Sequence, residues 1–89
     1  MQRRTYWFSG RVQGVGFRYT AKNIAMRYDV RGYVRNLPDG RVELVIEGDP
    51  VRMDQIVEQV RRKMDGFIDK SEMVAAEATG EFQQFSIRH

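Results

Sequence analysis

The chain is 89 residues long, 42% hydrophobic and 30% charged, with a net charge of +3 at pH 7. This length allows one domain with one core, over residues 1–89, and no stretch approaches the roughly 20 apolar residues that span a bilayer. With no cysteine and one histidine, the chain cannot build a disulfide, a thiolate nucleophile or a histidine metal site, so we expect neither a metal nor a cofactor.

The charge and the N-terminus give two further expectations. The small positive charge weakly favours anionic partners, and a phosphorylated small molecule satisfies it as well as RNA does. The N-terminal ten residues contain two arginines but only three consecutive aromatic residues. A signal peptide needs an apolar region of about 7–15 residues. We therefore expect a cytoplasmic protein.

The first predicted elements are a strand over residues 4–12 and a helix after it. Apolar and polar residues alternate along the strand, which is typical of a half-buried strand. Its inner face is expected to carry Tyr6, Phe8, Gly10 and Val12. After the glycines, apolar residues recur at helical spacing and predict a helix of about three turns. This stripe consists of Ala21, Ile24, Ala25 and Tyr28.

A hairpin is predicted over residues 31–48. Its turn is the segment "LPDG", in which Pro38 presets a turn dihedral and Gly40 allows a positive φ. The residues expected on the inner face of the hairpin are Val34, Val42, Leu44 and Ile46.

A second helix is expected next, capped by Asp49, with Pro50 at its first position and Gly66 after its end. Its apolar stripe consists of Met53, Ile56, Val57, Val60 and Met64. Residues 68–79 are a weaker strand candidate, because they are alanine-rich and alternate poorly. Residues 82–89 are expected to form a short extended tail. Its packing residues are Phe82, Phe85 and Ile87.

This order of elements predicts an α+β fold, the ferredoxin-like βαββαβ sandwich. Right-handed crossovers place both helices on one face of an antiparallel sheet, in the strand order 4-1-3-2. In that fold the turn after the first strand leads into the N-terminus of the first helix. Unpaired backbone N–H groups and the helix dipole favour an anion there.

The candidate site in this fold consists of the glycine turn and two polar residues, Arg18 and Asn36. Gly14 and Gly16 would let the amides of residues 15–18 point inward around a phosphate, and Arg18 would add a forked, charged donor. The same glycines could serve only as a turn, with Arg18 solvated. Asn36 ends a strand near this turn, although an asparagine before a turn that contains proline is also ordinary turn chemistry. The lysine and hydroxyl of a Walker-type loop are missing.

The segments "GRVQGVGFR" and "GYVRNLPDGRVELVIEGD" together resemble the two signature segments of the acylphosphatases, small ferredoxin-like enzymes that hydrolyse the carboxyl-phosphate bond of acyl phosphates. The resemblance runs over residues 4–49, and the second helix and the C-terminal segment also fit. It implies that the backbone of residues 13–18 binds phosphate and that Asn36 positions the attacking water. The implied phosphate-binding residues are Gln13, Gly14, Val15, Gly16, Phe17 and Arg18.

Such an enzyme needs few catalytic groups, because a carboxylate leaves without a general acid. Amides and Arg18 can stabilise the phosphoryl charge without a metal. The expected partners are a small acyl phosphate and inorganic phosphate, and the expected state is a monomer. Asp39 and Glu43 are interpreted as turn and exposed-strand residues with no catalytic role.

Two alternatives remain. An RNA-binding module would use Trp7, Tyr33 and Val45 on the sheet face away from the helices, with Arg11 and Arg35 beside them. The aromatic signature of RNA-recognition domains is absent, since Glu43 and Glu47 occupy the corresponding strand. A module from a larger carbamoyl-transfer protein is the second alternative, and a stand-alone enzyme is the simpler interpretation.

Overall fold

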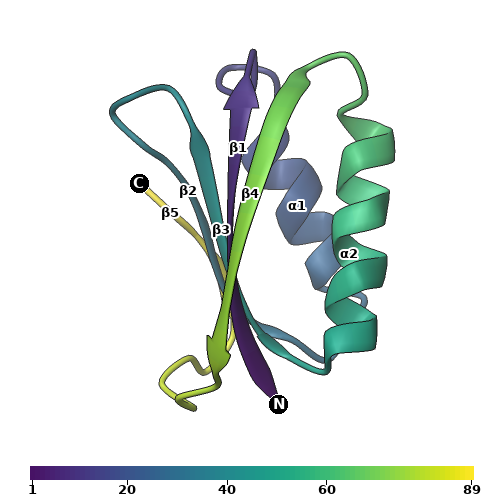
Figure 1. Cartoon of the computed structure of the whole chain (residues 1–89), viewed down its shortest axis with the longest axis vertical. Helices are drawn as coiled ribbons and strands as arrows, with labels where there is room; N and C mark the ends of the chain where they lie inside the picture. Colours follow the sequence, from purple (N-terminus) through teal and green to yellow (C-terminus); the bar gives the residue numbers. More distant parts are fainter.

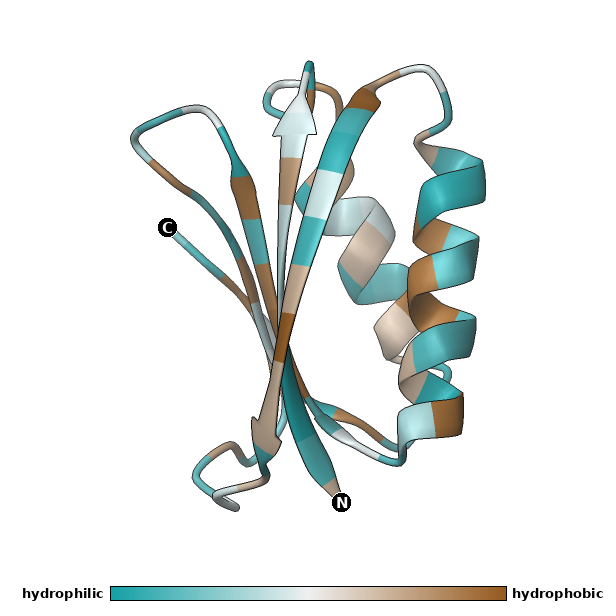
Figure 2. Cartoon of the chain, viewed as in Figure 1, coloured by the Kyte–Doolittle hydropathy of each residue, from teal (hydrophilic) through white to brown (hydrophobic).

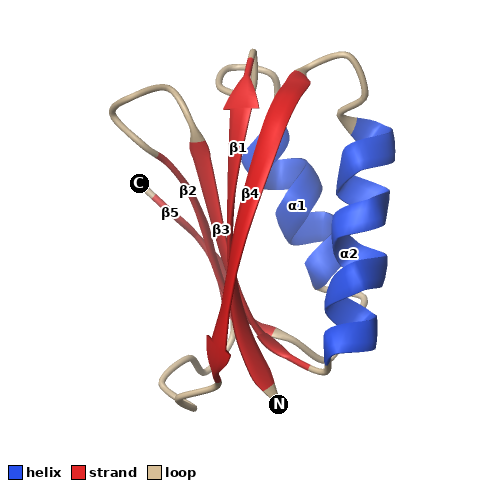
Figure 3. Cartoon of the chain, viewed as in Figure 1, coloured by secondary structure: helices blue, strands red, loops and turns tan.

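The computed structural model describes all 89 residues, which form five strands and two helices. In chain order the elements are β1 (Gln2–Gly10), α1 (Phe17–Ala25), β2 (Arg31–Asn36), β3 (Val42–Gly48), α2 (Pro50–Lys63), β4 (Ile68–Glu77) and β5 (Phe85–Arg88). Both helices lie on one face of the sheet and leave the other face without a helix (Figures 1 and 3). The ferredoxin-like α+β fold is therefore confirmed. Neither helix has the length and the unbroken apolar run that crossing a membrane requires.

The strand order is β4-β1-β3-β2-β5, which contains the predicted order 4-1-3-2. The first four strands pair antiparallel, as expected. The C-terminal segment differs from the expected tail, because β5 pairs with β2 in parallel and makes the sheet mixed. Phe85, at the start of β5, is buried in the core. The added strand thus extends the sheet on the side of β2.

The core lies between the helices and the sheet, as the apolar stripes predict. The predicted stripe of α2 is buried throughout, and Figure 2 shows the hydrophobic positions of this helix mainly on the side toward the sheet. Helix α1 is shorter than expected, since it ends at Ala25 and leaves Tyr28 in the following turn. Asp49 caps α2 as predicted, with Oδ1 accepting a hydrogen bond from the Val51 amide at 2.9 Å. The largest fully buried core side chains are Phe8, Phe17, Ile24, Leu44, Ile46, Met53 and Ile56.

Glu43 is buried on the face away from the helices, which corrects its interpretation as an exposed strand residue. Its side chain accepts hydrogen bonds from Trp7 Nε1 at 3.0 Å, from the Tyr33 hydroxyl at 2.9 Å and from Arg35 Nε at 2.9 Å. Strand β3 has a neighbour on each side, so side chains from β1 and β2 converge over this carboxylate. Asp39 is a turn residue, as predicted, because Oδ1 accepts from the Arg41 amide at 3.0 Å.

The face away from the helices presents no row of free aromatic rings. Tyr33 packs edge-on against Phe82 with the ring centroids 5.8 Å apart, and the Arg88 guanidinium lies 3.9 Å from the centre of the Tyr33 ring. Val45 is buried, and Trp7 is held by Glu43. Aromatic rings that stack RNA bases must offer an open face. Here Phe82, from the loop before β5, and Arg88, from β5, pack against the Tyr33 ring.

Glu47 forms a second buried carboxylate network, at the far end of β3 from the hairpin turn. It accepts from Arg3 Nε, from the Thr79 amide and from the Gly80 amide, at 2.8, 2.8 and 2.9 Å. These hydrogen bonds outweigh the effect of burial and lower the pKa of Glu47 to about 2. The network ties the loop between β4 and β5 to the centre of the sheet.

Candidate active site

The site begins with the backbone of the glycine loop, residues 13–18, which connects β1 to α1. Gly14 and Gly16 have φ angles of 77° and 79°, in the left-handed region, and no residue other than glycine has a positive φ in this chain. A Cβ atom at either position would meet nothing within 4 Å. Glycine is thus required by the backbone conformation and not by crowding. The space above the loop is open.

The backbone N–H groups of this loop are available to a ligand. Gly16 is the N-cap of α1 and offers no capping side chain, and the first helical hydrogen bond runs from the Thr20 amide to the Gly16 carbonyl at 3.0 Å. The amides of residues 14–19 donate no hydrogen bond within the protein. Several unpaired donors at the positive end of a helix dipole create a site for an anion.

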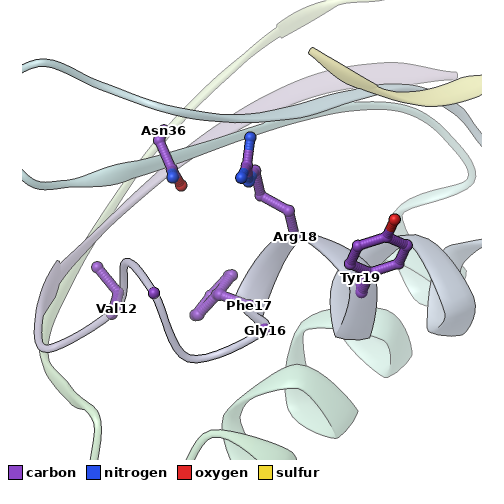
Figure 4. Close-up of a pocket in the computed structure, with 7 residues that line it drawn as sticks. Val12, Gly16, Phe17, Arg18, Tyr19 and Asn36 are labelled. Carbon is purple, nitrogen blue, oxygen red and sulfur yellow. The ribbon is translucent and has the colours of Figure 1, made fainter. Parts of the chain in front are cut away.

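A pocket of about 210 Å³ lies over these amides. Arg18, in the first turn of α1, and Asn36, the last residue of β2, both project into the space above the loop (Figure 4). The fold therefore brings together the two side chains that the sequence singled out. The residues that line the pocket are Val12, Gly14, Gly16, Phe17, Arg18, Tyr19 and Asn36.

Both polar side chains in the pocket keep free hydrogen-bonding capacity. The side-chain amide of Asn36 makes no hydrogen bond in the protein, although the residue is partly buried. The one hydrogen-bond partner of the Arg18 guanidinium is Nδ1 of His89, 3.2 Å from Nη1. A guanidinium has five N–H donors, so most of those on Arg18 remain for a ligand. The contact with His89 was not foreseen, because it joins residues 71 positions apart.

Gln13 lies outside the pocket, and its side chain braces the loop. Nε2 donates to the carbonyl of Leu37 at 2.8 Å and to that of Arg41 at 2.9 Å, on the two sides of the hairpin turn. These hydrogen bonds tie the loop to the strand end that carries Asn36. Val15 also lies outside the pocket lining and packs against the core. The two predicted residues can therefore contribute to an anion site only through their backbone.

The structure contains no group of three or more His, Cys, Asp or Glu side chains that could hold a metal ion. The donors that converge in the pocket are amide N–H groups, a guanidinium and a carboxamide. Such a set binds an oxyanion and can orient a water molecule. It offers no carboxylate or imidazole inside the pocket to act as a general acid or base.

A ferredoxin-like domain whose first strand and first helix are joined by a turn with free backbone amides is the class that fold and site define. The family model described as Acylphosphatase matches residues 4–87, and the chain belongs to this family. A protein named acylphosphatase from Methylococcus capsulatus is 42% identical over 92 aligned positions, which cover 98% of this chain and 96% of that protein.

Solved structures agree with this assignment. The crystal structure of acylphosphatase from Bacillus subtilis matches with a TM-score of 0.91 and 31% identity, over 100% of both chains. The crystal structure of T. kodakarensis HypF matches with a TM-score of 0.84 and 31% identity, over 100% of this chain and 12% of that one. These matches support the acylphosphatase function and give no support to the RNA-binding alternative.

Proposed function

We propose that the protein hydrolyses the carboxyl-phosphate bond of small acyl phosphates and releases a carboxylate and inorganic phosphate. The observation that carries the proposal is the convergence of the loop amides, Arg18 and Asn36 in one pocket. Each of these groups alone has an ordinary structural explanation. Together they supply what phosphoryl transfer to water needs, namely a cradle for the phosphoryl oxygens and a group that places the water.

The phosphoryl group would lie over Gly14 and Gly16. There the free amides of residues 14–18 and the Arg18 guanidinium donate to its oxygens. The amide donors are fixed before the substrate arrives, because the helix and the φ angles of the two glycines set their directions. Preorganised donors stabilise the charge on the oxygens in the transition state without reorganising at that moment.

Asn36 would position the nucleophile. Its side-chain oxygen accepts a hydrogen bond from a water molecule, whose oxygen then attacks phosphorus. A P–O bond to this water forms while the bond from phosphorus to the acyl oxygen breaks, and the electron pair leaves with the carboxylate. A neutral amide is a poor base, so the water proton passes to a phosphoryl oxygen or to solvent. The products are a carboxylate and orthophosphate.

The nature of the leaving group explains why no general acid is present in the pocket. A carboxylate is a weak base and departs without being protonated. The leaving group of a phosphate ester is an alkoxide or phenoxide, which is a stronger base, so its departure benefits from a general acid. We therefore expect acyl phosphates to be cleaved much faster than phosphate esters.

The test is hydrolysis of benzoyl phosphate by the purified protein with EDTA present, next to phenyl phosphate as the ester control. The expected result is rapid turnover of benzoyl phosphate that the chelator does not change, little turnover of the ester, and competitive inhibition by inorganic phosphate. Absence of benzoyl phosphate hydrolysis overturns the proposed function. Activity that EDTA abolishes overturns the metal-independent mechanism.

The remaining proposals concern the setting of the enzyme. We propose that residues 1–89 form a single domain that acts as a monomer in the cytoplasm, with a small acyl phosphate as substrate and no nucleic acid partner. Light scattering of the purified protein measures its mass in solution. A mobility-shift assay with single-stranded RNA tests the last point, and binding that competes with inorganic phosphate would contradict it.

A further inference from the structure

Tyr19 is a pocket residue that the proposed mechanism leaves without a role. It follows Arg18 in the first turn of α1 and lines the pocket, and it is 71% exposed. Two other apolar side chains in the lining, Val12 and Phe17, are 0% and 2% exposed and belong to the core. Tyr19 is therefore the large side chain of the pocket that can offer a substrate an open aromatic face.

The Tyr19 side chain has no structural partner. Its hydroxyl makes no hydrogen bond, its ring joins none of the aromatic pairs in the protein, and it lies outside the hydrophobic core. A ring without a partner in the protein keeps both its face and its hydroxyl available to a ligand. Its removal should leave the fold intact, which makes its role open to a clean test.

The geometry of phosphoryl transfer places the acyl group on the Tyr19 side of the pocket. The attacking water and the leaving oxygen lie roughly in line, on opposite sides of phosphorus. In Figure 4 Asn36 lies at one end of the pocket and Tyr19 at the other, with the Arg18 guanidinium between them. A water held by Asn36 therefore has the acyl oxygen depart away from Asn36, and Tyr19 is the lining residue that lies in that direction in this view.

We infer that Tyr19 forms the subsite for the acyl group and favours acyl phosphates with a flat, apolar acyl part, such as an aromatic ring. This assignment rests on the proposed function and on the place of Asn36 in it. Tyr19 acts by contact with the part of the substrate that does not react. It thereby determines specificity without taking part in the chemistry. A small acyl group such as acetyl is too short to cover the ring.

The experiment compares kcat and KM for benzoyl phosphate and acetyl phosphate in the unmodified protein and in Tyr19→Ala and Tyr19→Phe. Met26→Ala is the control, because Met26 is 64% exposed at the other end of α1 and does not line the pocket. Chemical denaturation of each variant verifies the fold. Calorimetry with inorganic phosphate verifies that the phosphoryl site is unchanged.

We expect Tyr19→Ala to lower kcat/KM for benzoyl phosphate by about two- to tenfold, the range typical of a lost aromatic contact. The change should appear in KM, with kcat and the activity on acetyl phosphate nearly unchanged. Tyr19→Phe and Met26→Ala should behave like the unmodified protein. An equal effect of Tyr19→Ala on both substrates, or none on either, overturns the inference. If the unmodified protein hydrolyses neither substrate, the proposed function itself fails and the subsite with it.

Discussion

Alanine substitutions at Arg18 and Asn36 should produce two different defects. In the proposed mechanism Arg18 contacts the phosphoryl group in both the ground state and the transition state, so Arg18→Ala should weaken the binding of inorganic phosphate. A hydrogen bond to a charged group contributes about 1.5–3 kcal/mol. About 1.4 kcal/mol corresponds to a factor of ten in affinity. Loss of even one such bond therefore predicts at least about a tenfold weaker affinity for phosphate, together with slower turnover.

Asn36→Ala should bind phosphate with nearly the affinity of the unmodified protein, because the amides of residues 14–18 and Arg18 remain in place. In the proposed mechanism it loses the orientation of the water. Orientation contributes about 7–11 kcal/mol in favourable cases, and deletion of one group removes only part of this. We expect kcat to fall by about a hundredfold or more, with little change in KM.

The assay pairs calorimetry of inorganic phosphate binding with the kinetics of benzoyl phosphate hydrolysis. Asn23→Ala and Arg62→Ala serve as controls, since both side chains are exposed and neither lines the pocket. Two results would refute the reasoning. Equal losses of phosphate affinity in the two variants would show that Asn36 belongs to the cradle. Unchanged turnover in Asn36→Ala would reduce Asn36 to a turn residue.

Three further predictions concern residues around the site and at the opposite end of the sheet. Gln13→Ala removes two hydrogen bonds to the hairpin turn. It should lower the free energy of unfolding by about 1–2 kcal/mol and raise KM for benzoyl phosphate. Denaturant titration measures the first effect and enzyme kinetics the second. Unchanged values would mean that the loop holds its shape without the Gln13 hydrogen bonds. The pKa of Glu47 is about 2 in the folded protein against 4.5 normally, so it should contribute up to about 3 kcal/mol at neutral pH. This contribution is present above pH 4.5 and is lost as the pH falls toward 2. The free energy of unfolding of Glu47→Gln should therefore depend less on pH in that window than that of the unmodified protein. Parallel pH curves for the two proteins would contradict the lowered pKa of Glu47. His89→Ala should raise KM about two- to fivefold by freeing the Arg18 side chain, with partial rescue in His89→Gln; an unchanged KM would show that Arg18 is oriented without His89.

Periodicity in the sequence is sufficient to predict most of the fold. The stripe of α2 is buried as expected, since a 14-residue helix must bury one face against the sheet. Gly14 and Gly16 mark the loop because only glycine adopts its φ angles without strain. Arg18 and Asn36 meet because the end of β2 lies at the same end of the sheet as the loop. That follows from the order 4-1-3-2.

The features that the sequence did not predict depend on contacts across the sheet. Glu43 alternates with apolar residues and so has the pattern of a solvent-facing strand position. Its burial depends on Trp7 and Tyr33, which lie on two neighbouring strands. The brace formed by Gln13 reaches carbonyls 24 and 28 residues away, and no local pattern encodes such a reach. Periodicity does not predict the pairing of β5, because four residues are too few to show a period.

The pocket has two parts that respond differently to amino-acid substitution, the free amides around Gly14 and Gly16 and the exposed side chain of Tyr19. Most donors in the phosphoryl half belong to the main chain, which is the same for every residue except proline. Substitutions of neighbouring side chains therefore alter little of what holds the phosphate, provided that the two glycines remain. The rim at Tyr19 is built from one exposed side chain, and any residue that suits a helix can replace it. With Tyr19 as the acyl subsite inferred above, a single codon change can exchange one acyl preference for another, while the reaction stays the same.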